Sequence, residues 1–174
     1  GFTLPGGMQV ALLPKGARGE AVKAQLTLRY GDEKSLFGSG DVPEFTAALL
    51  DRGTPTMTRQ QIQDRFEALQ ADVRFGAGDT AATVAITTTR ANLPAVIALV
   101  GDILRNATLP ADDLEELRQQ TLSQIEAQRK EPEALVATAL ARHGDPYPRG
   151  DVRHARSFDE RVQDANLQVV VEKP

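Results

Sequence analysis

The spacing of hydrophobic residues changes from segment to segment along this chain of 174 residues. Residues 21–30 alternate between apolar and polar side chains, which is the period of a strand with one buried face. The same alternation occurs at residues 73–77 and 82–86, on the two sides of Gly78-Asp79. A short turn sequence between two such runs predicts a β-hairpin.

Other segments carry apolar residues three and four positions apart, the spacing of an amphipathic helix. Pro94 falls in the first turn of the clearest one, a position that tolerates proline. Thr58-x-x-Gln61 is a capping-box pattern and indicates where another helix begins. The helices predicted in this way span residues 42–52, 58–71, 92–104, 111–130 and 134–143. In the last of them we expect four apolar residues to point inward: Leu135, Val136, Ala139 and Leu140.

Two further segments, residues 8–14 and 167–171, are rich in Val and Leu and lie next to Gly or Pro, which indicates strands. Residues 144–157 contain many Pro, Gly and Asp residues and are predicted to form a loop. Strands are therefore grouped with helices instead of alternating with them one by one. This order predicts an α+β fold, with an antiparallel-rich sheet and helices packed on one face.

The composition is that of one globular domain and excludes several classes of function. Apolar residues make up 41% and charged residues 25% of the chain, so we predict a single domain over residues 1–174. The net charge is −4 and Lys and Arg never form a longer run than two, so we expect no nucleic-acid partner. No apolar run approaches the roughly 20 residues of a membrane-spanning helix, so we expect no membrane insertion. The start of the chain lacks the pattern of a signal peptide.

Few residues are candidates for catalysis or metal binding. The chain has no Cys, which excludes thiolate ligands and a Cys nucleophile. His143 and His154 could bind a metal together with Asp145 or Asp151, but their separation matches no common ligand spacing. A triad of Asp151, His154 and Ser157 would need three neighbouring loop positions and a nucleophile elbow that the sequence lacks. The residues themselves therefore indicate no active site.

Several blocks together resemble the M16 family of zinc metallopeptidases, the pitrilysin and insulinase type. Their order and spacing cover the chain from about residue 3 to residue 155, although each block alone is weak. The blocks are residues 4–10 (LPGGMQV), 26–32 (LTLRYGD), 49–54 (LLDRGT), 92–109 and 117–125. The resemblance implies the α+β fold of M16 and LuxS-like metallopeptidase domains.

The resemblance also implies where a zinc site would lie. Active members carry His-x-x-Glu-His on the helix before the Gly-Thr pair, with two zinc-binding histidines and a glutamate as general base. That motif aligns with residues 44–48, so that Glu44 and Ala48 occupy the ligand positions and Ala47 that of the base. The later zinc-binding glutamate aligns with Gln124. Because alanine has no lone pair for a metal, we expect neither bound zinc nor hydrolysis by this domain.

The resemblance implies a non-catalytic, degenerate peptidase domain that is part of a longer chain. Such a domain would help to form the substrate chamber and would contact a peptide substrate. Its partner would be a catalytic M16 domain that holds the zinc, on the same chain or on another subunit. The whole protein would then be a zinc metalloendopeptidase, and the family favours a periplasmic location.

Two alternatives remain open from the sequence. One is an autonomous α+β binding or assembly module unrelated to proteolysis, and the other is a metalloenzyme that uses His143 and His154. The C-terminal end also departs from the family, whose members carry a further helix before the last strand. Only about six residues separate Glu160 from Leu167, so either that helix is missing or a segment has been skipped in this sequence.

Overall fold

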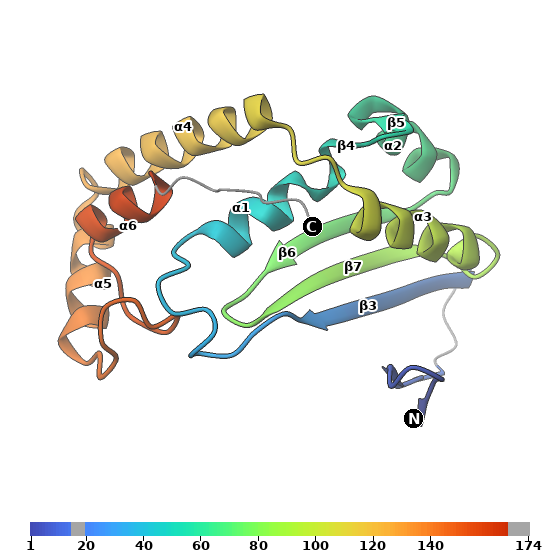
Figure 1. Ribbon diagram of the computed structural model, residues 1–174, viewed down its shortest axis with the longest axis horizontal. Coiled ribbons are helices and arrows are strands. Elements are labelled where there is room, and N and C mark those ends of the chain that lie inside the picture. Colours follow the sequence, from blue (N-terminus) through green and yellow to red (C-terminus); the bar gives the residue numbers. More distant parts are fainter. Residues whose placement is uncertain (15–19, 167–174) are drawn as a thin grey trace.

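Three antiparallel strands form the central sheet. In a computed structural model that describes residues 1–14 and 20–166, the strands are β3 (Ala21–Arg29), β7 (Ala81–Thr89) and β6 (Asp72–Ala77), and β7 lies in the middle (Figure 1). In β3 and β7, Ala21 pairs with Thr89 at one end and Arg29 with Ala81 at the other. The predicted hairpin is confirmed, since β6 and β7 pair directly and the Gly78 amide donates to the Ala81 carbonyl over 2.8 Å.

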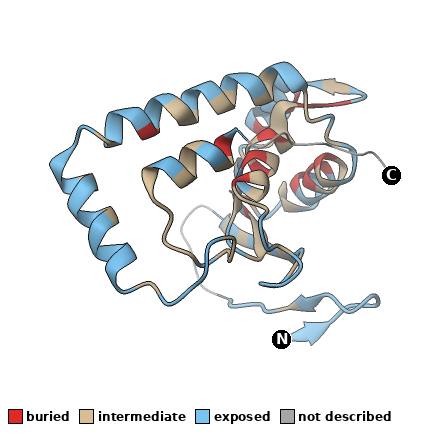
Figure 2. Ribbon diagram, turned by 60° about the vertical axis from the view of Figure 1, so that its left-hand side comes forward, coloured by how far each residue is buried: buried red, intermediate tan, exposed pale blue. Residues whose placement is uncertain are grey.

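One face of the sheet is buried under helices, as predicted. Along β7 the side chains of Val84 and Ile86 are 1% and 4% exposed, whereas Ala85 and Thr87 between them are exposed. Helices α2 (Arg59–Ala68) and α3 (Leu93–Asn106) supply most of the remaining core. The core residues are Ile62, Phe66, Val84, Ile86, Val96, Leu99, Val100 and Ile103. Figure 2 shows these buried positions gathered between the sheet and the helices.

The segment between β3 and α2 forms helix α1 (Val42–Leu49), a short 3₁₀ helix η2 (Leu50–Arg52) and the strand pair β4 (Gly53–Thr54) and β5 (Met57–Thr58). The helix therefore ends at the predicted place, but Gly53 is extended instead of forming a left-handed cap. Thr58 begins α2 with the predicted capping box, because its hydroxyl accepts from the Gln61 amide while the Gln61 side chain accepts from the Thr58 amide.

Three helices complete the described chain. Helix α4 (Ala111–Gln128) packs against α1 and against α6 (Phe158–Ala165), while α5 (Pro132–His143) extends away from the sheet (Figure 1). The prediction that four apolar side chains of α5 point inward is wrong, since Leu135, Val136, Ala139 and Leu140 are all exposed. The spacing predicts a helix correctly but does not say whether a neighbour covers its apolar side.

Helix α6 lies before the last predicted strand, where the sequence left open whether a helix is present. It begins at Ser157, whose side chain and that of Glu160 form a reciprocal capping box. Phe158, Val162 and Ala165 follow at helical spacing, and Ala165 is fully buried. Residues 144–157 form a loop, as predicted. The predicted strand 167–171 lies outside the described residues.

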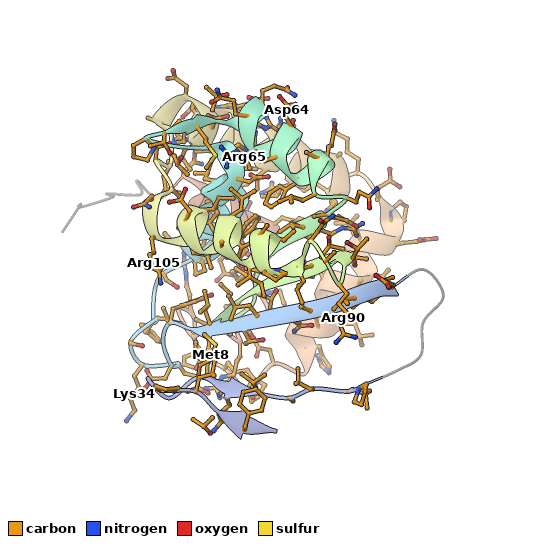
Figure 3. All side chains as sticks on the ribbon, turned by 90° about the vertical axis from the view of Figure 1, so that its right-hand side faces the viewer. Met8, Lys34, Asp64, Arg65, Arg90 and Arg105 are labelled. Atoms are coloured by element: carbon orange, nitrogen blue, oxygen red, sulfur yellow. The ribbon has the colours of Figure 1, made fainter. Side chains whose placement is uncertain are left out.

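The N-terminal strand is shorter than predicted and belongs to a separate hairpin. Of residues 8–14 only β2 (Gln9–Val10) is a strand, and it pairs with β1 (Phe2–Thr3) instead of with the central sheet. In Figure 3 the segment that carries Met8 lies beside β3, apart from α2 and α3. Its apolar residues are exposed, so the hydrophobic pattern alone overestimated its length. Among the described residues no single helix is long and apolar enough to cross a membrane, and only α3 and α4, bent by 93°, pass that test as a pair.

Candidate functional site

Helices α1 and α4 enclose a pocket of about 280 Å³ together with residues near α6. The pocket lies where the sequence comparison expected a degenerate zinc site. Its lining combines apolar side chains with two carboxylates and two arginines. The lining residues are Asp41, Glu44, Phe45, Ala48, Leu117, Thr121, Ile125, Arg156 and Arg161.

Two of the three predicted positions on α1 line this pocket. Glu44 and Ala48 are four residues apart, which places them one turn apart on the same side of the helix. Phe45 is only 5% exposed and closes the inner end. Ala47, the position of the general base, is also 5% exposed but does not line the pocket. On α1, the pocket is therefore lined by the polar Glu44 and by Ala48, which has no polar side-chain group.

The aligned residue on α4, Gln124, does not line the pocket, but its neighbour Ile125 does. Gln124 is exposed and is not among the lining residues, whereas Ile125 is 1% exposed and lines the pocket. Leu117, Thr121 and Ile125 recur every four residues, so they share one side of the helix, and Gln124 is turned about 100° from Ile125. That spacing was the signal in the sequence that identifies the pocket face of α4. The α4 wall of the pocket therefore consists of Leu117, Thr121 and Ile125, and the buried Ile125 contributes a branched hydrocarbon side chain.

Arg156 joins the pocket to the helices on both sides. Its Nη1 donates to a carboxylate oxygen of Asp41 before α1 and, over 3.0 Å, to Oδ2 of Asp164 on α6. Burial opposes the charge of Arg156, but the hydrogen bonds that it donates to Asp164 and Asp41 outweigh burial and raise its pKa above the ordinary value. Arg161 is also engaged, since its Nη1 donates to Gln128 Oε1 over 2.8 Å.

Glu44 has a different environment. It stays exposed at the pocket rim, and among the described residues its carboxyl has neither an ion pair nor a side-chain hydrogen bond. The surrounding protein atoms nevertheless remove water from it, and this desolvation raises the pKa of Glu44. The charges of Asp41 and Asp79 raise that pKa further, while Arg156 opposes them. Glu44 is therefore a carboxyl group without a nearby cation of its own.

The pocket residues do not fit zinc. Zinc in proteins is held by imidazole, thiolate and carboxylate ligands, usually three or four of them. Of the residues at the aligned ligand positions only Glu44 offers such a group, because Ala48 has no ligand atom and Gln124 carries an amide and does not line the pocket. Within residues 1–14 and 20–166, no group of three or more His, Asp and Glu side chains could hold a metal ion.

The histidines of the alternative metal site have other surroundings. His154 lies between two carboxylates, with its Nδ1 2.6 Å from Asp145 Oδ2 and its Nε2 3.5 Å from Glu160 Oε1. It thereby ties the loop 144–157 to α6. His143 is exposed at the end of α5. Ser157 caps α6 with its hydroxyl, which accounts for that group without a catalytic triad.

Comparison with solved structures identifies relatives of this fold. A peptidase M16 inactive domain from Pseudomonas fluorescens superimposes with a TM-score of 0.72 at 21% identity, over 87% of this chain and 36% of the other. A protease from Helicobacter pylori gives a TM-score of 0.68 at 13% identity, over 87% and 36%. The periplasmic protease PqqL from Escherichia coli gives 0.58 at 12% identity, over 86% and 17%. At the level of sequence, no family model and no curated protein matches the chain.

The chain spans about a third of the first two structures and about a sixth of PqqL. It is therefore comparable to one domain of these larger molecules. The likeness covers 86–87% of this chain. The chain thus has the α+β fold of M16 peptidase domains and is similar to an inactive one.

Proposed function

We propose that this chain is a non-catalytic peptidase-like domain that forms part of the wall of a substrate chamber. An active M16-type half, on the same chain or on another subunit, would complete the chamber and would hold the zinc. The observation that supports this proposal is the α1–α4 pocket, which is lined by Glu44 and Ala48, the residues that the resemblance aligns with zinc-ligand positions, and by Ile125. The scaffold is retained and the groups for hydrolysis are absent from it.

The shape and chemistry of the pocket support binding. The pocket has a volume of about 280 Å³ and opens to solvent. Its walls consist of apolar side chains next to a few charged ones. Concave apolar sites with a small number of placed polar groups are typical binding sites. A peptide side chain is an occupant of suitable size.

The sheet offers a second mode of peptide contact. In the central sheet β3 and β6 are the outer strands, each paired on one side only among the described residues. An extended peptide can add to such an edge through main-chain hydrogen bonds. Contact through a sheet edge would bind peptides with little regard to sequence, while a pocket would select among side chains.

The partners and the location follow from the relatives. Because the matched region is only 17–36% of the similar structures, a domain of this kind is expected to act beside others. PqqL is a periplasmic protease, and this supports the periplasm as the location of the present protein.

Peptide binding without cleavage tests the proposal. The purified chain is mixed with internally quenched peptides, with and without added Zn²⁺, and hydrolysis and binding are both measured. We expect the peptides to remain intact under both conditions, and hydrogen exchange at α1 and α4 to slow when peptide is present. Zinc-dependent cleavage by the wild-type chain would overturn the proposal, and so would a failure of any peptide to bind.

A further inference from the structure

The charged groups around the α1–α4 pocket are not equivalent. Asp41 and Asp164 both bind Arg156, and Arg161 donates to Gln128. Glu44 is the lining residue whose charge has no such partner within the described part of the chain. The pocket therefore presents one carboxylate that is free to bind a further group.

The walls below Glu44 are apolar. Phe45 and Ile125 are 5% and 1% exposed and form the inner surface, and Ala48 and Leu117 add hydrocarbon on the two sides. Thr121 completes the α4 wall. A group that enters here would have an apolar environment along its length and an anion at one end.

We propose that this pocket binds the basic side chain of a peptide, with its aliphatic stem against the apolar walls and its cation at the Glu44 carboxylate. Lys and Arg combine these two properties, since both carry a hydrocarbon stem with a charged head. This inference rests on the proposed function, which supplies the peptide. It adds the class of side chain that the pocket selects.

The size of the pocket fits one side chain. Its volume of about 280 Å³ lies below the roughly 300–1,000 Å³ of most small-molecule sites. A whole cofactor or a folded segment would not fit within it. A single long side chain that enters from an extended peptide would fill the pocket while the backbone of the peptide stays outside.

Side chains of other chemistry fit less well. An acidic side chain would meet Glu44 and Asp41, while Arg156 already binds two carboxylates and Arg161 already donates to Gln128. An apolar side chain of the same length would cover the walls but would remove more water from Glu44 without offering it a partner. The basic side chain satisfies both parts of the pocket.

Three fluorescent peptides that differ at one position test the inference. They carry lysine, norleucine or glutamate between identical flanking alanines, and their binding to the whole chain is measured by anisotropy. We expect the lysine peptide to bind about fivefold more tightly than the norleucine peptide, the scale of one partly exposed ion pair. The preference should weaken as salt is added, because salt screens an exposed pair.

Two variants test whether Glu44 causes the preference for the lysine peptide. Glu44→Gln should abolish the preference for lysine over norleucine. Glu116→Gln removes the same charge from the exposed side of α4, where Glu116 accepts only from Gln120, and it should keep the preference. Circular dichroism of both variants verifies that they remain folded.

The outcomes separate this inference from the proposed function. If lysine and norleucine peptides bind equally to the wild-type chain, the basic-side-chain site is wrong while peptide binding stands. The same holds if Glu116→Gln abolishes the preference as fully as Glu44→Gln does. If none of the three peptides binds, both the inference and the proposed peptide contact are wrong.

Discussion

At the scale of single residues, the α1–α4 pocket depends on which side chains face inward from each helix. Glu44 and Ala48 face it from α1, and Ile125 faces it from α4. A one-residue difference on α4 changes the character of that wall, because Gln124 lies in solvent and Ile125 lies in the interior. These positions can be tested through stability and through titration.

Ile125 contributes to stability and Gln124 does not. Replacing Ile125 by Ala removes buried methyl groups and leaves a cavity between α4 and α1, which should lower the free energy of unfolding by about 2–5 kcal/mol. Gln124→Ala is the matched control on the exposed side and should change it by less than about 0.5 kcal/mol. Chemical denaturation measures both. Equal effects would contradict the assignment of Ile125 to the pocket.

Glu44 is expected to lower the free energy of unfolding as the pH rises, which is the opposite of the usual effect of a carboxyl group in a folded protein. Its pKa in the folded chain is raised by desolvation, so the folded state binds its proton more readily than the unfolded state. The contribution of Glu44 is therefore most favourable below its ordinary pKa, 4.5, and becomes less favourable as pH rises through the folded value. The melting temperature of Glu44→Gln relative to wild type should be higher at pH 7 than at pH 4. A difference of the opposite sign would show that Glu44 has a partner cation.

At the scale of elements, the loop 144–157 and α6 hold the C-terminal part of the described chain against α1 and α4. Arg156 bridges Asp41 and Asp164, and His154 lies between Asp145 and Glu160. The loop has no regular structure, so these ion pairs and the helix cap determine its conformation. Two of these interactions lead to measurable predictions.

The cap of α6 stabilises a helix of only eight residues. The Ser157 hydroxyl accepts from the Glu160 amide, and its loss leaves that amide without a partner at the helix start. Ser157→Ala should lower the free energy of unfolding by about 1 kcal/mol. Ser123→Ala, at an exposed position within α4, is the control and should have little effect. Similar values for the two variants would mean that the cap does not anchor α6.

Asp151 should titrate at unusually low pH. Arg153 binds it through two hydrogen bonds, of 2.9 Å to Oδ1 and 2.8 Å to Oδ2, and these lower its pKa from 3.8 to about 2. Because the folded value lies below the unfolded one, this pair stabilises the loop fully above about pH 4, and the effect is lost as pH falls towards 2. Carboxyl NMR should give a midpoint near 2 for Asp151 and a higher one in Arg153→Gln. A wild-type midpoint near 3.8 would contradict the pairing.

Local patterns predicted most elements, and the failures have physical reasons. The alternation at residues 21–30 and the hairpin at Gly78 were predicted correctly, because a half-buried strand leaves a period of two in the sequence. Helix α6 was missed although Ser157 and Glu160 form a capping box, because eight residues leave too short a periodic pattern. The inward side of α5 was wrong, since periodicity identifies an apolar side but not its neighbour.

At the scale of the whole molecule, the fold resembles one domain of larger proteases, and we propose that the site between α1 and α4 lacks the residues needed for hydrolysis. The resemblance identified α1 as the helix of the degenerate motif, and the pocket lies beside it. Counting along the sequence located the α4 position only to within one residue, because a helix turns by about 100° per residue. Three-dimensional packing, and not spacing from a distant motif, identifies Ile125.

The central claim is that the α1–α4 scaffold is intact and lacks only the groups that bind and use zinc. Restoring those groups tests it: Glu44→His, Ala47→Glu, Ala48→His and Ile125→Glu are combined, and bound zinc is measured by elemental analysis after dialysis against Zn²⁺. The control carries Gln124→Glu in place of Ile125→Glu.

We expect about one zinc per chain for the restored variant, and clearly less for the control and for the wild type. Stoichiometric zinc in the wild-type chain would contradict the claim that its ligands are missing. A folded restored variant that binds no more zinc than the wild type would contradict the claim that the scaffold is intact.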